Sequence, residues 1–279
     1  IKRCLTSVLN LGYNNYEVIV VDDGSQDKTG EIIQSFSARV KVISYSQGRG
    51  PSRARNEAVR QARGEFVAFT DADCIVDKNW LKELLFGFSG SNIVSVGGMQ
   101  KIPDDETKFG RLVAKFMQKA GFLTDYMRGG QEGLILVNHN PSCNVMYKKE
   151  IFLAEGGFLE SLWPGEDVEL DHRLKKMGKK IVFNARAIVS HYRPHNLKYF
   201  CKMMFRYGHA QGLLVRRYGI FRRIQILPFI TVGLVPILFI GIYWNTKATI
   251  YLIISFFLGS FIFLLFNLQL AFMSVATFT

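Results

Sequence analysis

Cysteine is scarce in this chain, and its cysteines lie far apart. The 279 residues contain four of them, Cys4, Cys74, Cys143 and Cys201, with no Cys-x-x-Cys pair. Closely spaced cysteines are the usual sign of a zinc site or a disulfide framework, so their absence argues against both. Isolated reduced thiols are instead typical of a domain that faces the cytosol.

Acidic residues are absent from the last part of the chain. No Asp or Glu follows Asp171, and Lys247 is the only charged residue from Ile224 onward. The net charge of +12 therefore comes largely from residues 172–223. Nucleic acid is one candidate partner for such a basic surface, but the apolar segments behind it favour anionic lipid headgroups. We expect a membrane partner and no nucleic acid.

Long apolar runs are confined to the end of the chain. Residues 224–244 and 248–273 are each long enough to cross a hydrocarbon core, and the short loop between them fits a hairpin of antiparallel spans. Before them, residues 197–207 combine apolar side chains at helical spacing with lysine and arginine, as a helix in a membrane interface does. Buried helices of a soluble core are the alternative for both segments. A cluster of four arginines just before the spans places the preceding domain on the cytoplasmic side of the membrane.

Two carboxylates follow a short apolar stretch in the globular part. Residues 65–70 have the composition of a buried strand, and Gly64 ends the helix predicted before it. Asp71 and Asp73 come directly after this strand with one alanine between them, so both side chains can face one point. Two hard oxygen ligands suit Mg²⁺ or Mn²⁺, which keeps open positions for phosphate oxygens. A strand that ends in a solvated polar loop is the alternative.

Strands and helices alternate before this stretch. Residues 17–21 and 40–44 are predicted strands, the first of them apolar on both faces as a central parallel strand is, and a helix is predicted after each. This alternation with short loops predicts a doubly wound, mostly parallel α/β sheet, and ligands bind such sheets beyond the carboxyl ends of the strands. The pair Asp22–Asp23 lies at such an end, as the pair Asp71–Asp73 does. We expect the four carboxylates to share one rim, where a cation or a hydrogen-bonding ligand offsets their repulsion.

The elements predicted after residue 75 are more widely spaced. We expect strands at 93–96, 181–183 and 187–189, and helices at 80–88, 108–122 and from about Glu166 to Met177, the last one closed by Gly178.

Six short motifs follow one another along the chain. They are Asp22-Asp23-Gly24-Ser25, Arg53-Ala54-Arg55-Asn56, Asp71-Ala72-Asp73, Gly156-Gly157-Phe158, Gly165-Glu166-Asp167 and Val189-Ser190-His191. Each motif alone is weak, but their order and spacing over about residues 1–210 are specific. Together they resemble the family 2 glycosyltransferases, inverting enzymes of the GT-A fold that use nucleotide-diphosphate sugars.

The resemblance implies roles on the donor side. Asp22 and Asp23 would contact the uracil and ribose of the nucleotide. The Asp71–Asp73 pair corresponds to the DXD motif of the family, which holds the ribose and the Mg²⁺ or Mn²⁺ ion that bridges the two phosphates and stabilises the departing diphosphate. Arg55 would position the nucleotide or the aspartates, with a solvated helix face as the alternative. His191 would reach the metal or a phosphate, with a buried structural histidine as the alternative.

The resemblance to family 2 glycosyltransferases also implies roles on the acceptor side. Asp167 corresponds to the catalytic base that takes the proton of the attacking hydroxyl, and helix capping is the alternative. Glu166 is a second candidate for this position. Asn140, Ser142 and Asn144 would shape the acceptor pocket.

Two family features are missing from the printed sequence. The first strand and its nucleotide-binding turn are absent, so we expect the chain to start one strand into the fold. The QxxRW signature of processive synthases is also absent, which favours the addition of a single sugar.

We therefore predict a GT-A catalytic domain at 1–196, a basic amphipathic interface segment at 197–223 and a transmembrane hairpin at 224–279. The predicted activity is inverting, metal-dependent hexosyl transfer from a nucleotide-diphosphate sugar, with a UDP-sugar favoured. The acceptor would be a lipid-linked or other glycan in cell-envelope or exopolysaccharide synthesis at the plasma membrane. A nucleotidyltransferase and a non-catalytic membrane scaffold are the alternatives.

Overall fold

The computed structural model of this chain describes residues 1–119 and 133–226. By its internal contacts the chain forms two units, Ile1–Arg217 and Tyr218–Thr279. All residues with a predicted chemical role belong to the first unit. The domain limits predicted at residues 196 and 223 stay predictions.

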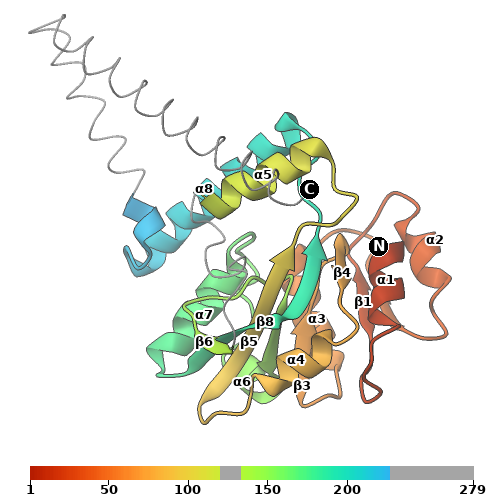
Figure 1. The fold of residues 1–279 in the computed structure, drawn as a ribbon, viewed down its shortest axis with the longest axis horizontal. Coiled ribbons are helices and arrows are strands. Elements are labelled where there is room, and N and C mark those ends of the chain that lie inside the picture. Colours follow the sequence, from red (N-terminus) through yellow and green to blue (C-terminus); the bar gives the residue numbers. More distant parts are fainter. Residues whose placement is uncertain (120–132, 227–279) are drawn as a thin grey trace, which may run out of the picture. The chain divides into compact units, whose positions relative to one another are not determined.

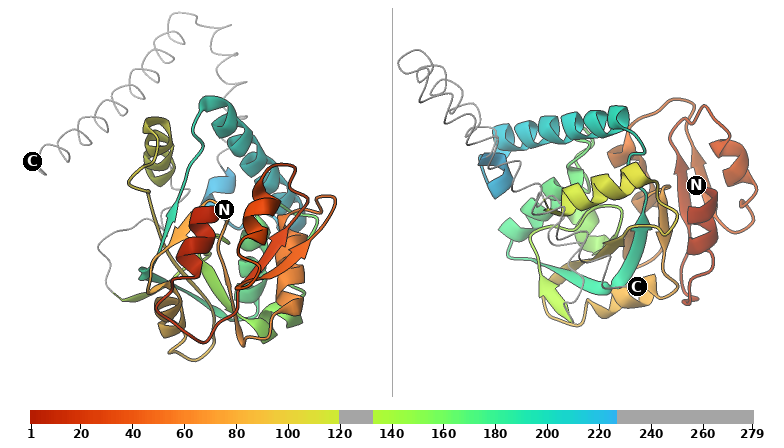
Figure 2. Two further views of the ribbon diagram at one scale, coloured as in Figure 1. Left: turned by 90° about the vertical axis from the view of Figure 1, so that its right-hand side faces the viewer. Right: turned by 45° about the horizontal axis from the view of Figure 1, so that its top comes forward.

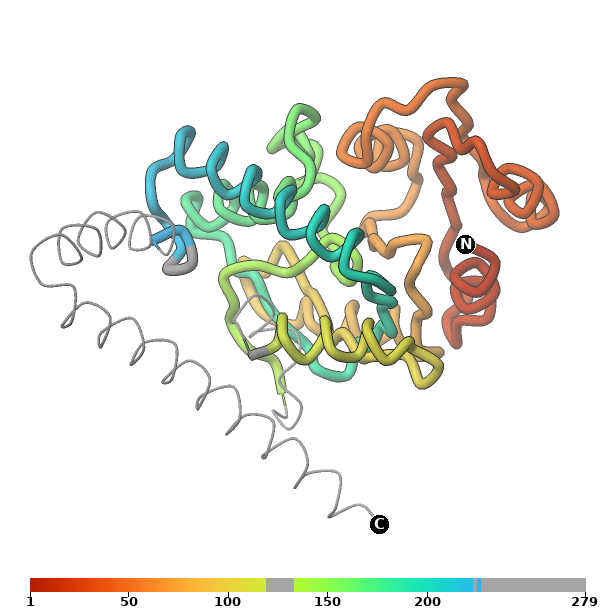
Figure 3. Tube along the Cα trace, turned by 90° about the horizontal axis from the view of Figure 1, so that it is seen from above, coloured from red at the N-terminus to blue at the C-terminus, as the bar shows by residue number. Residues whose placement is uncertain are grey.

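The first part of the chain builds a small parallel sheet. Strand β1 (Ile19–Asp22) pairs with β2 (Lys41–Ser44), and the helices around them are α1 (Lys2–Val8), α2 (Thr29–Gln34) and α3 (Pro51–Gln61). Figure 3 shows α1, α2 and β1 as one group at one edge of the unit. Proline at the first position of α3 fits because the amide it lacks would have no partner in the helix. The strands β1 and β2 and the helices α2 and α3 confirm the sequence predictions for this region.

A six-stranded mixed sheet forms the centre of the unit (Figure 1). Its order is β3-β7-β5-β8-β4, and β6 pairs with β8. The strands are β3 (Phe66–Phe69), β4 (Cys74–Val76), β5 (Ile93–Lys101), β6 (Leu134–Leu136), β7 (Val145–Lys148) and β8 (Lys180–His191). Only the pairing of β5 with β8 is parallel among those described in this sheet; the other four are antiparallel.

The prediction of a mostly parallel sheet is therefore wrong for this part of the fold. Apolar residues predict a buried strand but carry no information about its direction. The sequence prediction also missed β4, β6 and β7, which are three or four residues long and take part in every antiparallel pairing. What is supported is a mixed α/β architecture around a central sheet.

One bulge extends β8 beyond the two short strands that were predicted. In the register of β5 against β8, Gly98 pairs with Asn184 and the next residue, Met99, pairs with Ile188. The residues between them bulge out, so the strand continues as one element to His191. A Cβ atom on Gly98 would lie 1.9 Å from the carbonyl oxygen of Ala187, so this close approach requires glycine.

Helices cover both faces of the central sheet. Helices α3, α6 (Lys149–Ala154) and α7 (Glu166–Lys176) share a buried cluster with β3 and β7 that includes Phe69, Tyr147 and Leu170. Helices α1 and α4 (Trp80–Phe86) share a second cluster with β4 and β5 that includes Trp80 and Val96. The two clusters hold the ends of β3, β4 and β8 in place, where the predicted site lies.

Two further helices follow the carboxyl ends of β5 and β8. Helix α5 (Lys108–Lys119) and helix α8 (Leu197–Tyr218) run beside each other (Figure 2), and the Phe200 ring contacts the rings of Phe109 and Phe116. Two of the apolar side chains predicted to lie in a membrane interface, Phe200 and Tyr207, thus pack into a cluster with α5 and β8. Other apolar side chains of these helices are exposed, among them Phe205 at 78%.

The predicted membrane spans lie almost wholly at residues 227–279, outside the described residues. Within the described ranges, no helix has the length and apolar character needed to cross a bilayer, and the short 3₁₀ helix η1 (Arg223–Ile226) is the last element.

Candidate active site

The acidic turn after β1 is anchored to the start of α3. Asp23 accepts hydrogen bonds of 2.8 Å from the backbone amides of Arg49 and Gly50, and Asp22 accepts one of 3.0 Å from the amide of Ser25. Gly50, with φ +95°, is the residue before α3. Both carboxylates are therefore fixed at the carboxyl end of β1, and each keeps lone pairs for a further donor.

Arg55 connects the end of β3 to the start of α7. It lies on α3, donates to Asp71 Oδ1 at 2.6 Å through Nη2, and donates to Glu166 Oε1 at 2.7 Å through Nη1. Its side chain is only 16% exposed. Burial opposes the charge, but the two carboxylates outweigh it and raise the pKa of Arg55. Because the amide of Gly50, directly before α3, binds Asp23, both acidic pairs are tied to α3 or to its start. Arg55 does not lie on a solvated face.

The pairing of β4 with β8 brings His191 to the Asp71–Asp73 pair. Cys74 lies opposite His191 in this antiparallel ladder. His191 Nε2 is 3.5 Å from Asp73 Oδ1, and one ligand atom from each of Asp71, Asp73 and His191 lies within 4.8 Å of the others. Two carboxylates and an imidazole are a donor set suited to Mg²⁺ or Mn²⁺, with Mn²⁺ the better match for the nitrogen. The residues present therefore fit the predicted cation.

The orientation of His191 is fixed from the other side of its ring. Gln100 Oε1 accepts a 2.7 Å hydrogen bond from Arg193 Nη2, and it lies 3.2 Å from His191 Nδ1. An arginine can only donate, so the atom between them is the amide oxygen, and His191 Nδ1 must donate to it. In the neutral ring the lone pair is then on Nε2, which faces Asp73. A ligating histidine held in this way through its other nitrogen is the usual arrangement at metal sites.

Asp167 and Glu166 open helix α7 and are held by one loop residue. The amide of Ser142 donates to Asp167 Oδ2 at 2.9 Å, and its hydroxyl donates to Glu166 Oε1 at 3.2 Å. Asp167 stays partly accessible, with 14% of its side chain exposed. Glu166 is 2% exposed; burial raises its pKa to about 7, the charge of Asp167 adds to this effect, and Arg55 opposes it.

A buried histidine lies behind Asp167. His139 Nδ1 is 3.0 Å from Asp171 Oδ2, and its Nε2 is 3.9 Å from Asp167 Oδ2. Asp171 is fully buried and also accepts from the amide of Asn140 and the hydroxyl of Tyr147. Burial raises the pKa of Asp171. Since this carboxylate accepts three hydrogen bonds, it fixes the His139 ring next to Asp167.

Three residues predicted for the acceptor side are buried in the structure. Asn144 is fully buried, accepts from Trp80 Nε1 and donates to two backbone carbonyls, so it joins β5, β8 and α4. Glu166 is equally inaccessible and pairs with Arg55. Asn140 is fully buried as well, with its amide against Val182. In the described structure these three side chains therefore fill packed space, and their predicted place at an acceptor pocket stays a prediction.

Several residues at the site were not found from the sequence. His139 and Gln100 lie in no motif. Asp171 follows Asp167 by four residues, which places both on one face of a helix, and this spacing was the one available signal. The sulfurs of Cys74 and Cys143, expected to be isolated, lie within 4.8 Å of each other. The two cysteines are far apart in the sequence and come together only in the folded protein, so the sequence alone does not show that they are close.

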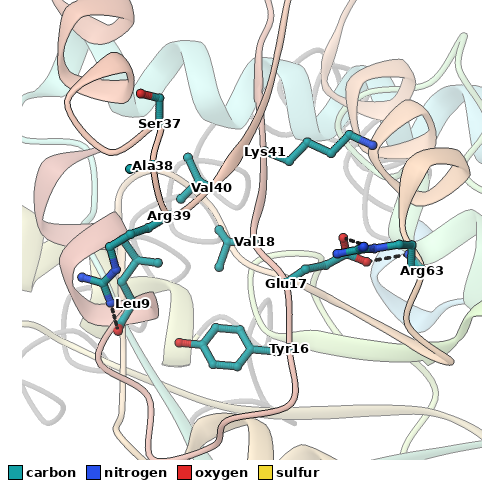
Figure 4. A pocket seen from close by; sticks show the side chains of 10 residues that line it. All are labelled: Leu9, Tyr16, Glu17, Val18, Ser37, Ala38, Arg39, Val40, Lys41 and Arg63. Atoms are coloured by element: carbon teal, nitrogen blue, oxygen red, sulfur yellow. Dashed lines mark hydrogen bonds and ion pairs between the residues drawn. The ribbon is translucent and has the colours of Figure 1, made fainter.

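A separate hollow of about 730 Å³ lies at the opposite ends of β1 and β2 (Figure 4). It is lined by residues before these strands, among them Tyr16, Val18 and Val40. Two of its cations already have partners: Arg63 pairs with Glu17, and Arg39 donates to the carbonyl of Leu9. None of the predicted site residues lines it, so it is not the candidate active site.

Comparisons with known proteins agree with the motifs. Residues 1–154 match the model of the family "Glycosyl transferase family 2". Glycosyltransferase AglE of Haloferax volcanii is 27% identical over 245 residues, covering 85% of this chain and 77% of AglE. A dolichyl N-acetyl-alpha-D-glucosaminyl phosphate glucuronosyltransferase of Methanococcus voltae is 25% identical over 243 residues, covering 82% of this chain and 74% of that protein. The chain spans only 45% of the pre-mycofactocin glycosyltransferase of Mycobacterium tuberculosis, which is 27% identical over 223 residues, 77% of this chain.

The fold is also shared with a solved structure. The mannosyltransferase PcManGT of Pyrobaculum calidifontis, solved with GDP-Man and Mn²⁺, aligns with a TM-score of 0.66 and 16% identity, over 91% of this chain and 74% of that one. This likeness supports a GT-A-like architecture. Since the family model covers more than half of the chain, the protein is a glycosyltransferase of family 2.

Proposed function

We propose that this protein transfers a sugar from a nucleoside-diphosphate sugar to a hydroxyl group of a lipid-linked or other glycan acceptor, with inversion at the anomeric carbon. The observation that carries the proposal is one connected set of side chains. Arg55 joins Asp71 to Glu166, and Ser142 joins Glu166 to Asp167. The carboxylates proposed for the donor side and the base proposed for the acceptor side are thus held together.

On the donor side, Asp71, Asp73 and His191 would hold a Mg²⁺ or Mn²⁺ ion. When bound, such a cation neutralises the charge that builds on the departing diphosphate. Asp22 and Asp23 keep lone pairs for N–H and hydroxyl groups of the nucleoside, and a UDP-sugar is the favoured donor. Arg55 holds Asp71 in place and does not face the solvent. The likeness to PcManGT, whose structure contains GDP-Man and Mn²⁺, supports a nucleotide-sugar donor and a divalent cation.

On the acceptor side, Asp167 would take the proton from the attacking hydroxyl. Its Oδ2 is oriented by the amide of Ser142, and its Oδ1 accepts from the amide of Val168 in the first turn of α7. An ionised carboxylate is the form of this side chain that accepts a proton. A positioned base of this kind contributes about 10²–10⁴ to the rate.

The acceptor is proposed to be lipid-linked and presented at the cytoplasmic face of the plasma membrane. Helices α5 and α8 lie beyond the strand ends that carry His191, and they expose Leu112, Phe116, Leu197 and Phe205 next to lysine and arginine. Apolar and basic side chains together are typical of a surface that lies on an anionic membrane. The Methanococcus relative acts, by its name, on a dolichyl-phosphate-linked sugar.

The test is transfer or hydrolysis from a panel of UDP- and GDP-sugars, with a lipid extract as the acceptor source. The full chain in detergent is assayed with Mn²⁺ and with a chelator, beside Asp73→Asn and Asp167→Asn. Asp104→Asn, an exposed carboxylate outside the site, is the matched control. We expect turnover that needs the metal, is lost in both site variants and is unchanged in the control.

Two further outcomes separate the alternatives. Asp167→Asn should still bind the nucleotide with metal, because the base does not touch the donor phosphates. If the wild type binds nucleotide and metal but consumes no sugar with any acceptor extract, the protein is a non-catalytic scaffold and the proposal fails.

A further inference from the structure

Two cysteines lie directly behind the proposed cation site. Cys74 follows Asp73, and Cys143 lies in the loop before β7; their side chains are 1% and 4% exposed. One ligand atom from each of Cys74, Cys143 and His191 lies within 4.8 Å of the other two. His191 therefore belongs to two ligand sets, one with two carboxylates and one with two thiols.

The sulfur–nitrogen distance in the second set is close to that of a thiolate–imidazole metal site. With Zn–S bonds of about 2.3 Å and Zn–N bonds of about 2.0–2.1 Å, the ligand atoms of a tetrahedral zinc ion are about 3.3–3.8 Å apart. Here Cys143 Sγ is 3.7 Å from His191 Nδ1, and Cys74 Sγ is 3.9 Å from Asp73 Oδ1. Asp73 Oδ1 is in turn 3.5 Å from His191 Nε2. Small inward movements would bring the two sulfurs and one nitrogen of His191 onto one ion. Only one ring nitrogen can bind that ion, because Nδ1 and Nε2 point in different directions, and binding through Nδ1 would replace its hydrogen bond to Gln100.

We propose that Cys74, Cys143 and His191 form a second metal site that binds a thiophilic divalent ion of the Zn²⁺ class. Soft sulfur ligands select such ions, whereas the carboxylates select Mg²⁺ and Mn²⁺. Two thiolates and one imidazole leave a fourth position for water or for Asp73. Both thiols lose their protons to the solvent when the ion binds.

The two ligand sets cannot both use His191 in its neutral form. If the soft ion binds Nδ1, the ring proton is carried on Nε2, where it faces Asp73 and blocks the lone pair. If the soft ion binds Nε2, it takes that lone pair directly. In either case the carboxylate site loses its nitrogen ligand. The soft ion therefore acts as a competitive inhibitor of the catalytic cation, a consequence that rests on the proposed function.

An ion can reach the thiols past Asp73. The Asp73 side chain is 59% exposed and that of His191 is 17% exposed, so the buried sulfurs lie behind a carboxylate that attracts cations. The other two cysteines are natural controls. Cys201 is exposed on α8, and the buried Cys4 donates to the carbonyl oxygen of Asp71.

The experiment uses the reduced, metal-free full chain in detergent and Co²⁺ as a coloured substitute for Zn²⁺. We expect a thiolate-to-cobalt charge-transfer absorption in the wild type that added Zn²⁺ removes. Cys143→Ser and Cys74→Ser should each abolish the band, while Cys201→Ser should keep it. Asp71→Asn, which belongs only to the carboxylate set, should keep the band and lose Mn²⁺ binding. Circular dichroism shows whether each variant is folded.

A second measurement needs no variant. The protein is briefly exposed to a mild denaturant, so that its buried thiols become accessible to an alkylating reagent. Zn²⁺ should protect Cys74 and Cys143, but not Cys201, from alkylation. Mass spectrometry of the peptides shows which cysteines are alkylated. In a transfer assay, Zn²⁺ at its dissociation constant should raise the apparent Kd for Mn²⁺ about twofold.

The outcomes separate this proposal from the proposed function. Absence of a thiolate band in the wild type, or a band that survives in folded Cys143→Ser and Cys74→Ser, overturns the second site even if transfer is normal. A band with the expected dependence on Cys143 and Cys74 supports the site even if no sugar is transferred, in which case the proposed function alone fails.

Discussion

Replacing Glu166 by glutamine should stabilise the protein at neutral pH and not at acidic pH. Glu166 is 2% exposed, and burial raises its pKa from 4.5 to about 7 although Arg55 is 2.7 Å away. The folded protein therefore holds a proton on this group in a pH range in which the unfolded chain has already released it. As the pH rises from about 4.5 to about 7, the wild type loses stability from this group, and above about 7 the loss is complete.

The size of the effect follows from the two pKa values. The difference between 4.5 and about 7 corresponds to about 3 kcal/mol of unfolding free energy. Glutamine resembles the protonated glutamic acid and has no such pH dependence. Glu166→Gln should match the wild type near pH 4.5 and exceed it by about 3 kcal/mol above pH 7, or about 6–12 °C in Tm for a domain of this size.

The assay is thermal unfolding of both proteins at a series of pH values, with the difference between them plotted against pH. Groups other than Glu166 contribute to both curves and largely cancel. Glu169→Gln is the matched control, because Glu169 is also buried on α7 but pairs with Arg173 at 2.9 Å; its loss should destabilise the protein. A difference between wild type and Glu166→Gln that does not grow with pH would refute the reasoning.

Three further predictions concern the surroundings of the site. Gln100→Leu should weaken Mn²⁺ binding about 10–100-fold in an electron paramagnetic resonance titration, since the histidine ligand loses its hydrogen-bond partner; unchanged affinity would contradict this. His139→Gln should lower kcat on the order of 10²-fold with little change in the donor KM, because Asp167 loses the ring beside it; an unchanged kcat in steady-state kinetics would show that the contact is only structural. Gly97→Ala should destabilise the fold by about 1–3 kcal/mol, as its Cβ would lie 2.2 Å from Asn140 Cγ, and a Tm equal to that of the wild type would exclude this clash.

The sequence predicts the elements that are long or apolar, together with the residues that belong to motifs. The strands β1, β2 and β3 and the helices α2 to α5 and α7 lie where the apolar pattern placed them. The convergence of Asp71, Asp73 and His191 was likewise expected from the resemblance, and the structure brings these three side chains together. Their roles in binding and catalysis stay predictions.

What the sequence does not predict depends on pairing between distant segments. Residues 184–186, two of which are polar, divide β8 into two apparent strands, but residues 185–187 bulge out and the ladder continues. The direction of β4 and β7 has no local signal, and neither has the position of Gln100 or His139. Asn144 has the same residue type as a sugar-binding side chain, and only its burial shows that it is structural.

The register that sets Cys74 opposite His191 also has a consequence for synthesis of the protein on the ribosome. Asp71 and Asp73 leave the ribosome roughly 120 residues before His191 does. At about 5–20 residues per second, the two aspartates wait roughly 6–24 s for their third partner. During that interval the nascent chain offers a divalent ion only two carboxylates on an unpaired segment, a weak and unselective ligand set. Capture of the proposed cation is therefore tied to completion of the central sheet, so a chain that stalls before β8 could not form the full proposed metal site.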